Sequence, residues 1–232
     1  MKLLLLISVA LLGSVNCACP ASLEADVVLL LDTSTAVDKS SYDSLSNTLV
    51  QSLGSCNISA HGVSETGVRL AVIDVPGDSW MTPLVTASFS TITSTNLLQK
   101  SLANAWPDPQ FDPPQATGQT LLSQAVNTAN SDNFRNQGYR SSETNHLIIY
   151  VTTSSSPNQD AITAAQTVRS SNSYGFLALS YNGNGANTNA LTSFVGGANC
   201  LLSANNQNDL NGLGDQLLNL INQASQNGGK YC

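Results

Sequence analysis

A carboxylate and a hydroxyl stand where a strongly apolar stretch of the chain gives way to a polar turn. Residues 27–31 are five consecutive apolar residues, too few for a helix with a buried face of its own and typical of a strand in a parallel sheet. Asp32 and Ser34 follow directly. Open α/β sheets bind ligands at the carboxyl ends of their strands, so these two side chains are candidate ligand-binding residues.

A second polar turn follows another apolar stretch. Residues 146–152 are mostly apolar and run straight into Thr153 and Ser154. The same strand-end argument makes this turn a candidate part of the binding surface.

Each of these residues also has a purely structural interpretation. Asp32 and Ser34 are residue types that bond backbone amides in turns. Thr120 is a good N-cap for the helix that apolar spacing predicts from residue 121. Taken singly, each side chain fits the structural role.

The sequence gives little support to enzyme chemistry. It contains no Gly-x-Ser-x-Gly nucleophile elbow. Of its two histidines, His61 lies in a predicted loop and His146 begins a predicted buried strand, where a hydrogen-bonded core histidine is expected. Residues 183–186 lack the third glycine of a dinucleotide-binding fingerprint and do not follow the first strand, so they are interpreted as a flexible loop. We therefore predict a protein that is not an enzyme.

The first residues have the pattern of a secretory signal peptide. Lys2 precedes an apolar run over residues 3–12, and small residues follow it. The run is too short to span a bilayer. We predict a signal peptide over residues 1–18, a secreted extracellular protein and no membrane insertion.

The charge of the chain narrows its partners. The formal net charge is −7, and the sequence holds no basic cluster. Nucleic acids attract proteins through clustered Lys and Arg, so we predict no nucleic-acid partner.

Four cysteines remain once the signal peptide is removed. An even number in a secreted chain predicts disulfides, here with three connectivities. Because domain termini often lie close together, we expect Cys19–Cys232 with Cys56–Cys200, and Cys19–Cys56 is the alternative. The single N-glycosylation sequon begins at Asn57, which we predict to be glycosylated.

Apolar runs and helical spacing alternate along the rest of the chain. Strands are expected over residues 27–31, 68–75, 84–89, 146–152, 176–180 and 200–203. Helices are expected over residues 39–53, 97–106, 159–170 and 190–195, from residue 121, and at the end through residues 210–221. The connection after residue 75 is too short for a helical crossover. The fold class is therefore α/β: a doubly wound, mostly parallel six-stranded sheet with one antiparallel edge strand, flanked by helices.

The order of elements and three short motifs resemble a von Willebrand factor A domain. The motifs are Asp-Thr-Ser at 32–34, Thr-Gly-Gln-Thr at 117–120 and Thr-Thr-Ser at 152–154. The resemblance covers residues 24–225 and leaves 226–232 as a C-terminal tail. It implies the strand order 3-2-1-4-5-6, which brings the first and fourth strands together and places both polar turns at one end of the sheet.

The resemblance also implies a metal-ion-dependent adhesion site, and this chain departs from it at two positions. Asp32, Ser34 and Thr120 match metal-binding positions of the family. Ala36 stands where the family has a second Ser, and Thr153 stands where it has a second Asp. Since Mg²⁺ in proteins is usually held through one or two carboxylates, we expect weak or no binding of Mg²⁺ or another divalent cation.

The resemblance favours a secreted binding or adhesion module that recognises an extracellular protein or glycan. Its ligand-binding residues would be Asp32, Ser34, Thr120, Thr153 and Ser154. A role in matrix or host defence is what the resemblance suggests. The alternatives are a secreted hydrolase with an unrecognised active site and a structural matrix component without a discrete ligand site.

Overall fold

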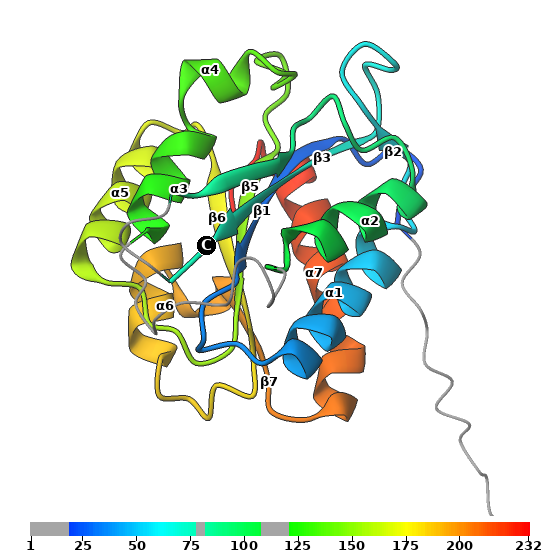
Figure 1. The fold of residues 1–232 in the computed structure, drawn as a ribbon. Coiled ribbons are helices and arrows are strands. Elements are labelled where there is room, and N and C mark those ends of the chain that lie inside the picture. The colour runs from blue at the N-terminus through cyan, green and yellow to red at the C-terminus, as the bar shows by residue number, and fades with distance from the viewer. Residues whose placement is uncertain (1–18, 78–81, 108–120) are drawn as a thin grey trace, which may run out of the picture.

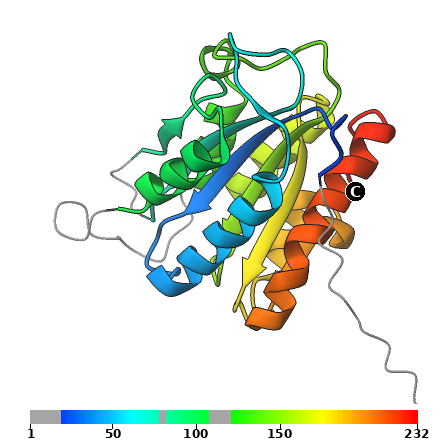
Figure 2. The same cartoon turned by 90° about the vertical axis from the view of Figure 1, so that its right-hand side faces the viewer.

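The computed structural model describes residues 19–77, 82–107 and 121–232. A twisted sheet forms the middle layer, with helices on both of its faces (Figure 1). Helices α1, α2 and α7 cover one face, and α3, α5 and α6 cover the other. Figure 2 looks onto the face that α1, α2 and α7 cover, where α1 and α7 pack against each other over the sheet.

The described residues form seven strands in one sheet. They are β1 (Ala25–Asp32), β2 (Ile58–Ser59), β3 (Val68–Val75), β4 (Leu84–Ala87), β5 (His146–Thr152), β6 (Gly175–Tyr181) and β7 (Leu201–Ala204). The order is β2-β3-β1-β5-β6-β7 with all pairs parallel, and β4 pairs antiparallel with β3. The predicted fold class and the predicted order of the six strands are confirmed. The two-residue strand β2 was not predicted, because two residues show no periodicity.

The helices lie close to their predicted positions. They are α1 (Lys39–Leu53), α2 (Thr95–Ala105), α3 (Leu122–Ala129), α4 (Asp132–Arg135), α5 (Gln159–Ser170), α6 (Thr188–Val195) and α7 (Gln207–Gln226), with a 3₁₀ turn at Ala198–Cys200. Side chains that precede the first turn fix several starts: Asp38 accepts from Ser41 N, and Asn158 accepts from Ala161 N. The four-residue helix α4 was not predicted. No helix in the described ranges is long and apolar enough to cross a membrane.

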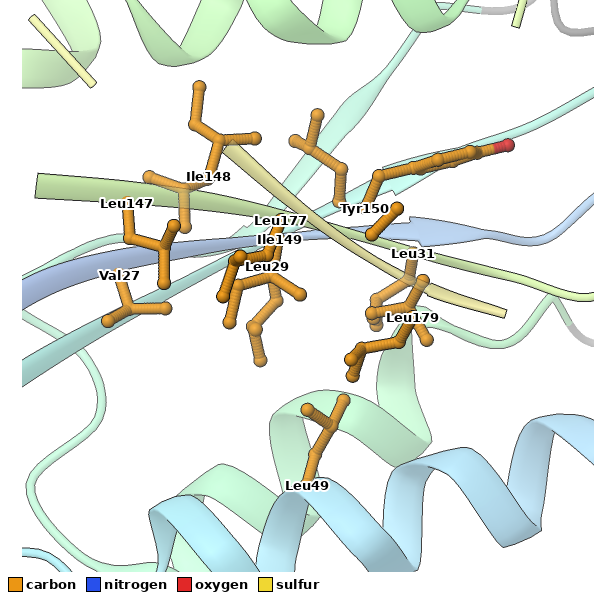
Figure 3. Packing of buried hydrophobic residues seen from close by; sticks show 14 of the residues in the cluster. Val27, Leu29, Leu31, Leu49, Leu147, Ile148, Ile149, Tyr150, Leu177 and Leu179 are labelled. Carbon is orange, nitrogen blue, oxygen red and sulfur yellow. The ribbon is translucent and has the colours of Figure 1, made fainter. Parts of the chain in front are cut away.

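Strand β1 is the centre of the core, and every one of its residues is buried. Its side chains alternate between the two faces of the sheet. Figure 3 shows Leu29 and Leu31 on the face of the sheet that Leu49 of α1 covers. Ile148 and Tyr150 of β5 lie on the opposite face. Burial on both faces explains the continuous apolar run that marks this strand in the sequence.

The disulfides join Cys19 to Cys56 and Cys200 to Cys232. The expected pairing of Cys19 with Cys232 and of Cys56 with Cys200 is therefore wrong, and the alternative Cys19–Cys56 is the one observed. Helix α1 returns the chain to the amino end of β1, which brings Cys56 beside the segment that leads into that strand. Helix α7 likewise returns the chain to the start of β7, which is the last strand in the order of the sheet. This brings Cys232 to Cys200, the residue that directly precedes β7.

The C-terminal residues pack against the amino end of the sheet. The Tyr231 ring lies against Gly175, where an added Cβ would meet it at 2.1 Å. Its hydroxyl donates to Asn145 Oδ1 at 2.5 Å. Gly229 has a φ of +75° and leaves no room for a Cβ beside the Thr144 carbonyl, so glycine is required there.

Candidate functional site

The two polar turns lie side by side because β1 and β5 are adjacent parallel strands. Leu30 pairs with Tyr150 and Leu31 with Val151, so both strands end at the same edge of the sheet. The turn after Asp32 and the turn after Thr152 therefore face each other.

Asp32 is buried, with 1% of its surface exposed, and both of its carboxylate oxygens accept hydrogen bonds from this chain. Oδ1 accepts from Ser34 N at 3.0 Å, the pattern expected of an Asp at the start of a turn. Oδ2 accepts from Thr152 Oγ1 at 2.5 Å and from the Tyr150 hydroxyl at 3.5 Å. Burial, together with the charge of Asp32, raises the pKa of Tyr150 well above its usual value, so this hydroxyl stays a neutral donor.

Ser34 also makes its contacts within the two turns. Its side chain is fully buried, and Oγ accepts from Ala36 N at 3.3 Å. The same oxygen lies 3.5 Å from Ser155 Oγ across the crevice between the turns. Ser34 therefore stabilises the first turn and contacts the second.

Thr153 and Ser154 hold the second turn against the first. Thr153 Oγ1 donates to the Ala36 carbonyl at 2.5 Å, and Ser154 Oγ donates to the same carbonyl at 3.2 Å. Thr153 is buried, whereas Ser154 is exposed. Ala36 and Thr153 are the two residues at which this chain departs from the family pattern. A direct hydrogen bond between them therefore joins the turns.

Asn187 is a positioning residue that sequence reasoning missed. Its side-chain amide donates to the carbonyls of Thr153 and Ser155, both at 2.9 Å, and Ser180 Oγ donates to the Thr153 carbonyl at 3.1 Å. Gly183 approaches the same carbonyl so closely that an added Cβ would lie 2.6 Å from it. The loop interpreted as flexible is thus attached to the second turn, and the available signal was a polar cluster after a strand next to β5.

Two further hydroxyls of the sequence motifs have a different status: Thr120 belongs to the predicted site, and Thr33 was not predicted to belong to it. Thr120 lies outside the described residues. Thr33 is 1% exposed, and its Oγ1 has no hydrogen-bond partner among the residues that the structure describes.

The described residues are a poor fit for a divalent cation. They supply one carboxylate, Asp32, whose two oxygens already accept hydrogen bonds. Thr153 offers a hydroxyl that donates to Ala36. Elsewhere in the described ranges, no group of three or more His, Cys, Asp or Glu side chains is placed to hold a metal. Mg²⁺ gives up its waters reluctantly and needs anionic oxygen ligands to replace them.

The outward side of the turns is polar and uncharged. Residues 33–37, 153–158 and 182–187 include no Asp, Glu, Lys, Arg or His. We call their exposed polar residues the hydroxyl–amide face; they are Thr35, Ser154, Ser156, Asn182 and Asn184. This face can donate and accept hydrogen bonds without charge.

His146 lies at the opposite end of the sheet. Its Nε2 donates to the Arg140 carbonyl at 2.9 Å, and its Nδ1 lies 3.0 Å from the Tyr139 hydroxyl. Burial lowers the pKa of His146, which suits a neutral ring with both nitrogens bonded. His61 is exposed in a loop.

The fold and these turns agree with a comparison against known families. The family model described as the von Willebrand factor type A domain matches residues 26–216. The chain belongs to the von Willebrand factor type A family. The resemblance found in the sequence is thereby confirmed, and domains of this family are typically adhesion or protein-interaction modules.

Similar proteins fit the same assignment. The chain is 31% identical over 213 residues to Protein irg-7 of Caenorhabditis elegans, covering 91% of this chain and 9% of that protein. Proximal thread matrix protein 1 of the mussel byssus has a similar structure, with a TM-score of 0.64, 12% identity and coverage of 87% of this chain and 46% of the other. The manganese-loaded TRAP protein of Plasmodium vivax gives a TM-score of 0.57 at 14% identity, over 84% of this chain and 73% of the other. At these identities the two structures support the fold alone.

Proposed function

We propose that this protein is a secreted von Willebrand factor A module that recognises an extracellular protein or glycan through its hydroxyl–amide face, without a bound metal ion. The observation that carries the proposal is the pair of hydroxyl bonds from Thr153 and Ser154 to the Ala36 carbonyl. These bonds join the two turns at the positions where the family's metal site needs a Ser and a second Asp.

A surface held in this way is organised before a partner arrives. Asn187 holds the second turn through two hydrogen bonds, and the close approach of Gly183 brings the loop at residues 183–186 against the same turn. Preorganised polar groups lose little conformational entropy on binding, so each hydrogen bond to a partner contributes more of its strength to affinity. Hydroxyl and amide side chains suit the neutral hydroxyls of glycans and the backbone groups of proteins.

Secretion is supported by three independent features. The N-terminal sequence has the pattern of a signal peptide, and the chain forms two disulfides, which persist in oxidising compartments. Asn57, the first residue of the sequon, is exposed. A loss of mass on enzymatic deglycosylation of the secreted protein, absent from Asn57→Gln, is the expected outcome for a glycan at this position.

The partner experiment uses full-length protein secreted from eukaryotic cells. Immobilised protein is presented with a glycan array and with purified extracellular-matrix proteins, in Mg²⁺ and in EDTA. We expect the same ligands in both buffers. Asn184→Arg and Ser154→Arg should weaken binding by ~tenfold or more if these residues lie at the centre of the contact. Ser170→Arg, on the exposed end of α5, is the matched control and should bind normally. Ligands lost only in EDTA would contradict a metal-free mode of binding.

Calorimetric titration with Mg²⁺ and Mn²⁺ tests the metal directly. We expect no saturable binding by the wild type. The double variant Ala36→Ser, Thr153→Asp should gain binding, since it restores a hydroxyl and a carboxylate. Micromolar binding by the wild type that is lost in Asp32→Ala would overturn the proposal.

A further inference from the structure

A cavity of about 500 Å³ opens at the amino end of β6, at the opposite end of the sheet from the hydroxyl–amide face. Its walls come from the end of α5, the start of β6, the end of α6 and the C-terminal segment. The lining includes Arg169, Tyr174, Phe176, Val195, Lys230 and Tyr231. The volume lies within the range of cavities that hold small molecules, ~300–1,000 Å³.

The cavity is cationic in an acidic chain. The sequence holds 15 Asp and Glu against 8 Lys and Arg. Arg169 and Lys230 line the cavity, no Asp or Glu among the described residues does, and the α-carboxylate of Cys232, which also lines it, offsets one of the two positive charges. The local charge is therefore opposite in sign to that of the whole protein, which favours an anionic occupant.

Arg169 stands apart from two other arginines that have carboxylate partners. Arg69 pairs with Glu65 and Arg140 pairs with Asp26, whereas Arg169 forms no ion pair with any described residue. One of its N–H groups donates to the Phe194 carbonyl, and the remaining donors of the guanidinium are available to a ligand. Burial lowers the pKa of Arg169, and a bound anion would offset that cost.

The rest of the cavity wall is aromatic and apolar. The Arg169 guanidinium lies 5.7 Å from the centre of the Phe176 ring, in a cation–π arrangement. Tyr174, Phe176 and Val195 are buried, and the Tyr231 ring packs on the backbone of Gly175. Tyr231 is the partly exposed ring of this wall, and a ligand that places its charge on the cations would lay an apolar body against it.

His146 lines the cavity but does not add to its charge. Both of its ring nitrogens face partners within the chain, Tyr139 and Arg140. Anion recognition would therefore depend on Arg169 and Lys230.

We propose that this cavity binds a small organic acid with an aromatic body, its carboxylate held by Arg169 and Lys230. This site is separate from the hydroxyl–amide face and does not depend on the function proposed for that face.

The test uses 2-naphthoate, with the neutral isostere 2-naphthamide as the matched ligand. Calorimetric titration of the full secreted protein should give saturable binding of the acid at one site and ~tenfold or weaker binding of the amide, since the amide cannot form the charge-assisted contact. Arg169→Met should reduce affinity for the acid by a similar factor. Lys230→Met should reduce it less, because Lys230 is exposed.

Arg135→Met is the matched control. Arg135 also lies over an aromatic ring, 4.1 Å from the centre of Tyr139, but it does not line the cavity. The affinity of the Arg135→Met variant for 2-naphthoate should equal that of the wild type. Chemical-shift changes at the Gly175 and Gly196 amides locate the ligand even if Arg169→Met fails to fold. Equal affinity for acid and amide, no saturation by the wild type, or shifts confined to the hydroxyl–amide face would each overturn the proposal.

Discussion

At the two ends of the sheet, different kinds of contact connect the neighbouring segments of the chain. At the carboxyl end, neutral hydroxyls and amides connect neighbouring turns. At the amino end, Asp26 is fully buried and accepts from Arg140 N at 2.7 Å and from Arg140 Nε at 2.8 Å. Both disulfides also lie at the amino end, because each joins a cysteine that precedes a strand to one that follows a returning helix.

Arg140 connects several segments of the amino end at once. Its guanidinium donates to the carbonyls of Ala25, Glu65 and Gly67, in addition to its bonds with Asp26. The start of β1 and the loops before β3 and β5 therefore share one buried cation. The contrast predicts that the contacts at the amino end contribute more to stability than those between the carboxyl-end turns.

Arg140→Met should have the largest effect on stability. It leaves the Asp26 carboxylate buried without its cation, which typically costs ~3–5 kcal/mol of unfolding free energy. Chemical denaturation followed by circular dichroism measures the loss. Lys100→Met, on the exposed side of α2, is the control and should stay within ~0.5 kcal/mol of wild type. A loss below ~1 kcal/mol for Arg140→Met would remove the proposed contrast between the two ends.

Removal of the Cys200–Cys232 disulfide should have the second-largest effect on stability. The paired substitutions Cys200→Ala and Cys232→Ala should lower the unfolding free energy by ~2–4 kcal/mol, because the unfolded chain gains freedom. The loss is measured by denaturation of variant and wild type in parallel. Since this disulfide is remote from the hydroxyl–amide face, partner binding at that face should not change. Weaker binding by the folded variant would show that the two ends are coupled.

Thr153→Val tests the carboxyl end at a smaller scale. The change keeps the shape of the side chain and removes the hydroxyl that bonds the Ala36 carbonyl, so a loss of ~1 kcal/mol is expected. Ser154→Ala removes an exposed hydroxyl that bonds the same carbonyl and should cost less than ~0.5 kcal/mol. Equal losses for the two variants would contradict the expectation that the buried hydroxyl of Thr153 contributes more than the exposed hydroxyl of Ser154.

The pH dependence due to His146 should be the smallest effect. Its pKa is lowered in the folded protein, so the unfolded state binds a proton first as the pH falls. Its contribution to stability is therefore full above pH 6.5 and decreases as the pH falls below that value. Burial is the largest influence and opposes protonation, the hydrogen bond to the Arg140 carbonyl and the charge of Asp26 favour it, and the positive charges of Arg135 and Arg140 oppose it. Unfolding free energy measured from about pH 7.5 to 5 should fall less steeply in His146→Gln, and parallel profiles would refute the assignment.

The sequence predicts the framework well because the relevant patterns are local. The apolar run of β1 and the spacing of Tyr42, Leu45, Leu49 and Leu53 in α1 each depend on neighbouring residues along the chain. The order of the strands was inferred from the family resemblance. The placement of the two turns at one end of the sheet followed from that order.

The remaining features depend on contacts between distant residues. Asp26 and Arg140 lie 114 positions apart, and the one local signal was a carboxylate at the start of a buried strand. The disulfide pairing depends on where α1 and α7 return the chain, which the closeness of domain termini does not determine. Asn187 acts on a turn 34 residues away, so its role could not be inferred before the β5–β6 pairing was known.

The absence of charge on the hydroxyl–amide face has a kinetic consequence. Residues 33–37, 153–158 and 182–187 supply no charge that could steer a partner from a distance. Any dependence of the association rate on ionic strength would therefore come from charges outside these turns, such as the exposed Asp38, rather than from the contact itself. Affinity at this face would then be set by how long the partner stays rather than by how fast it arrives.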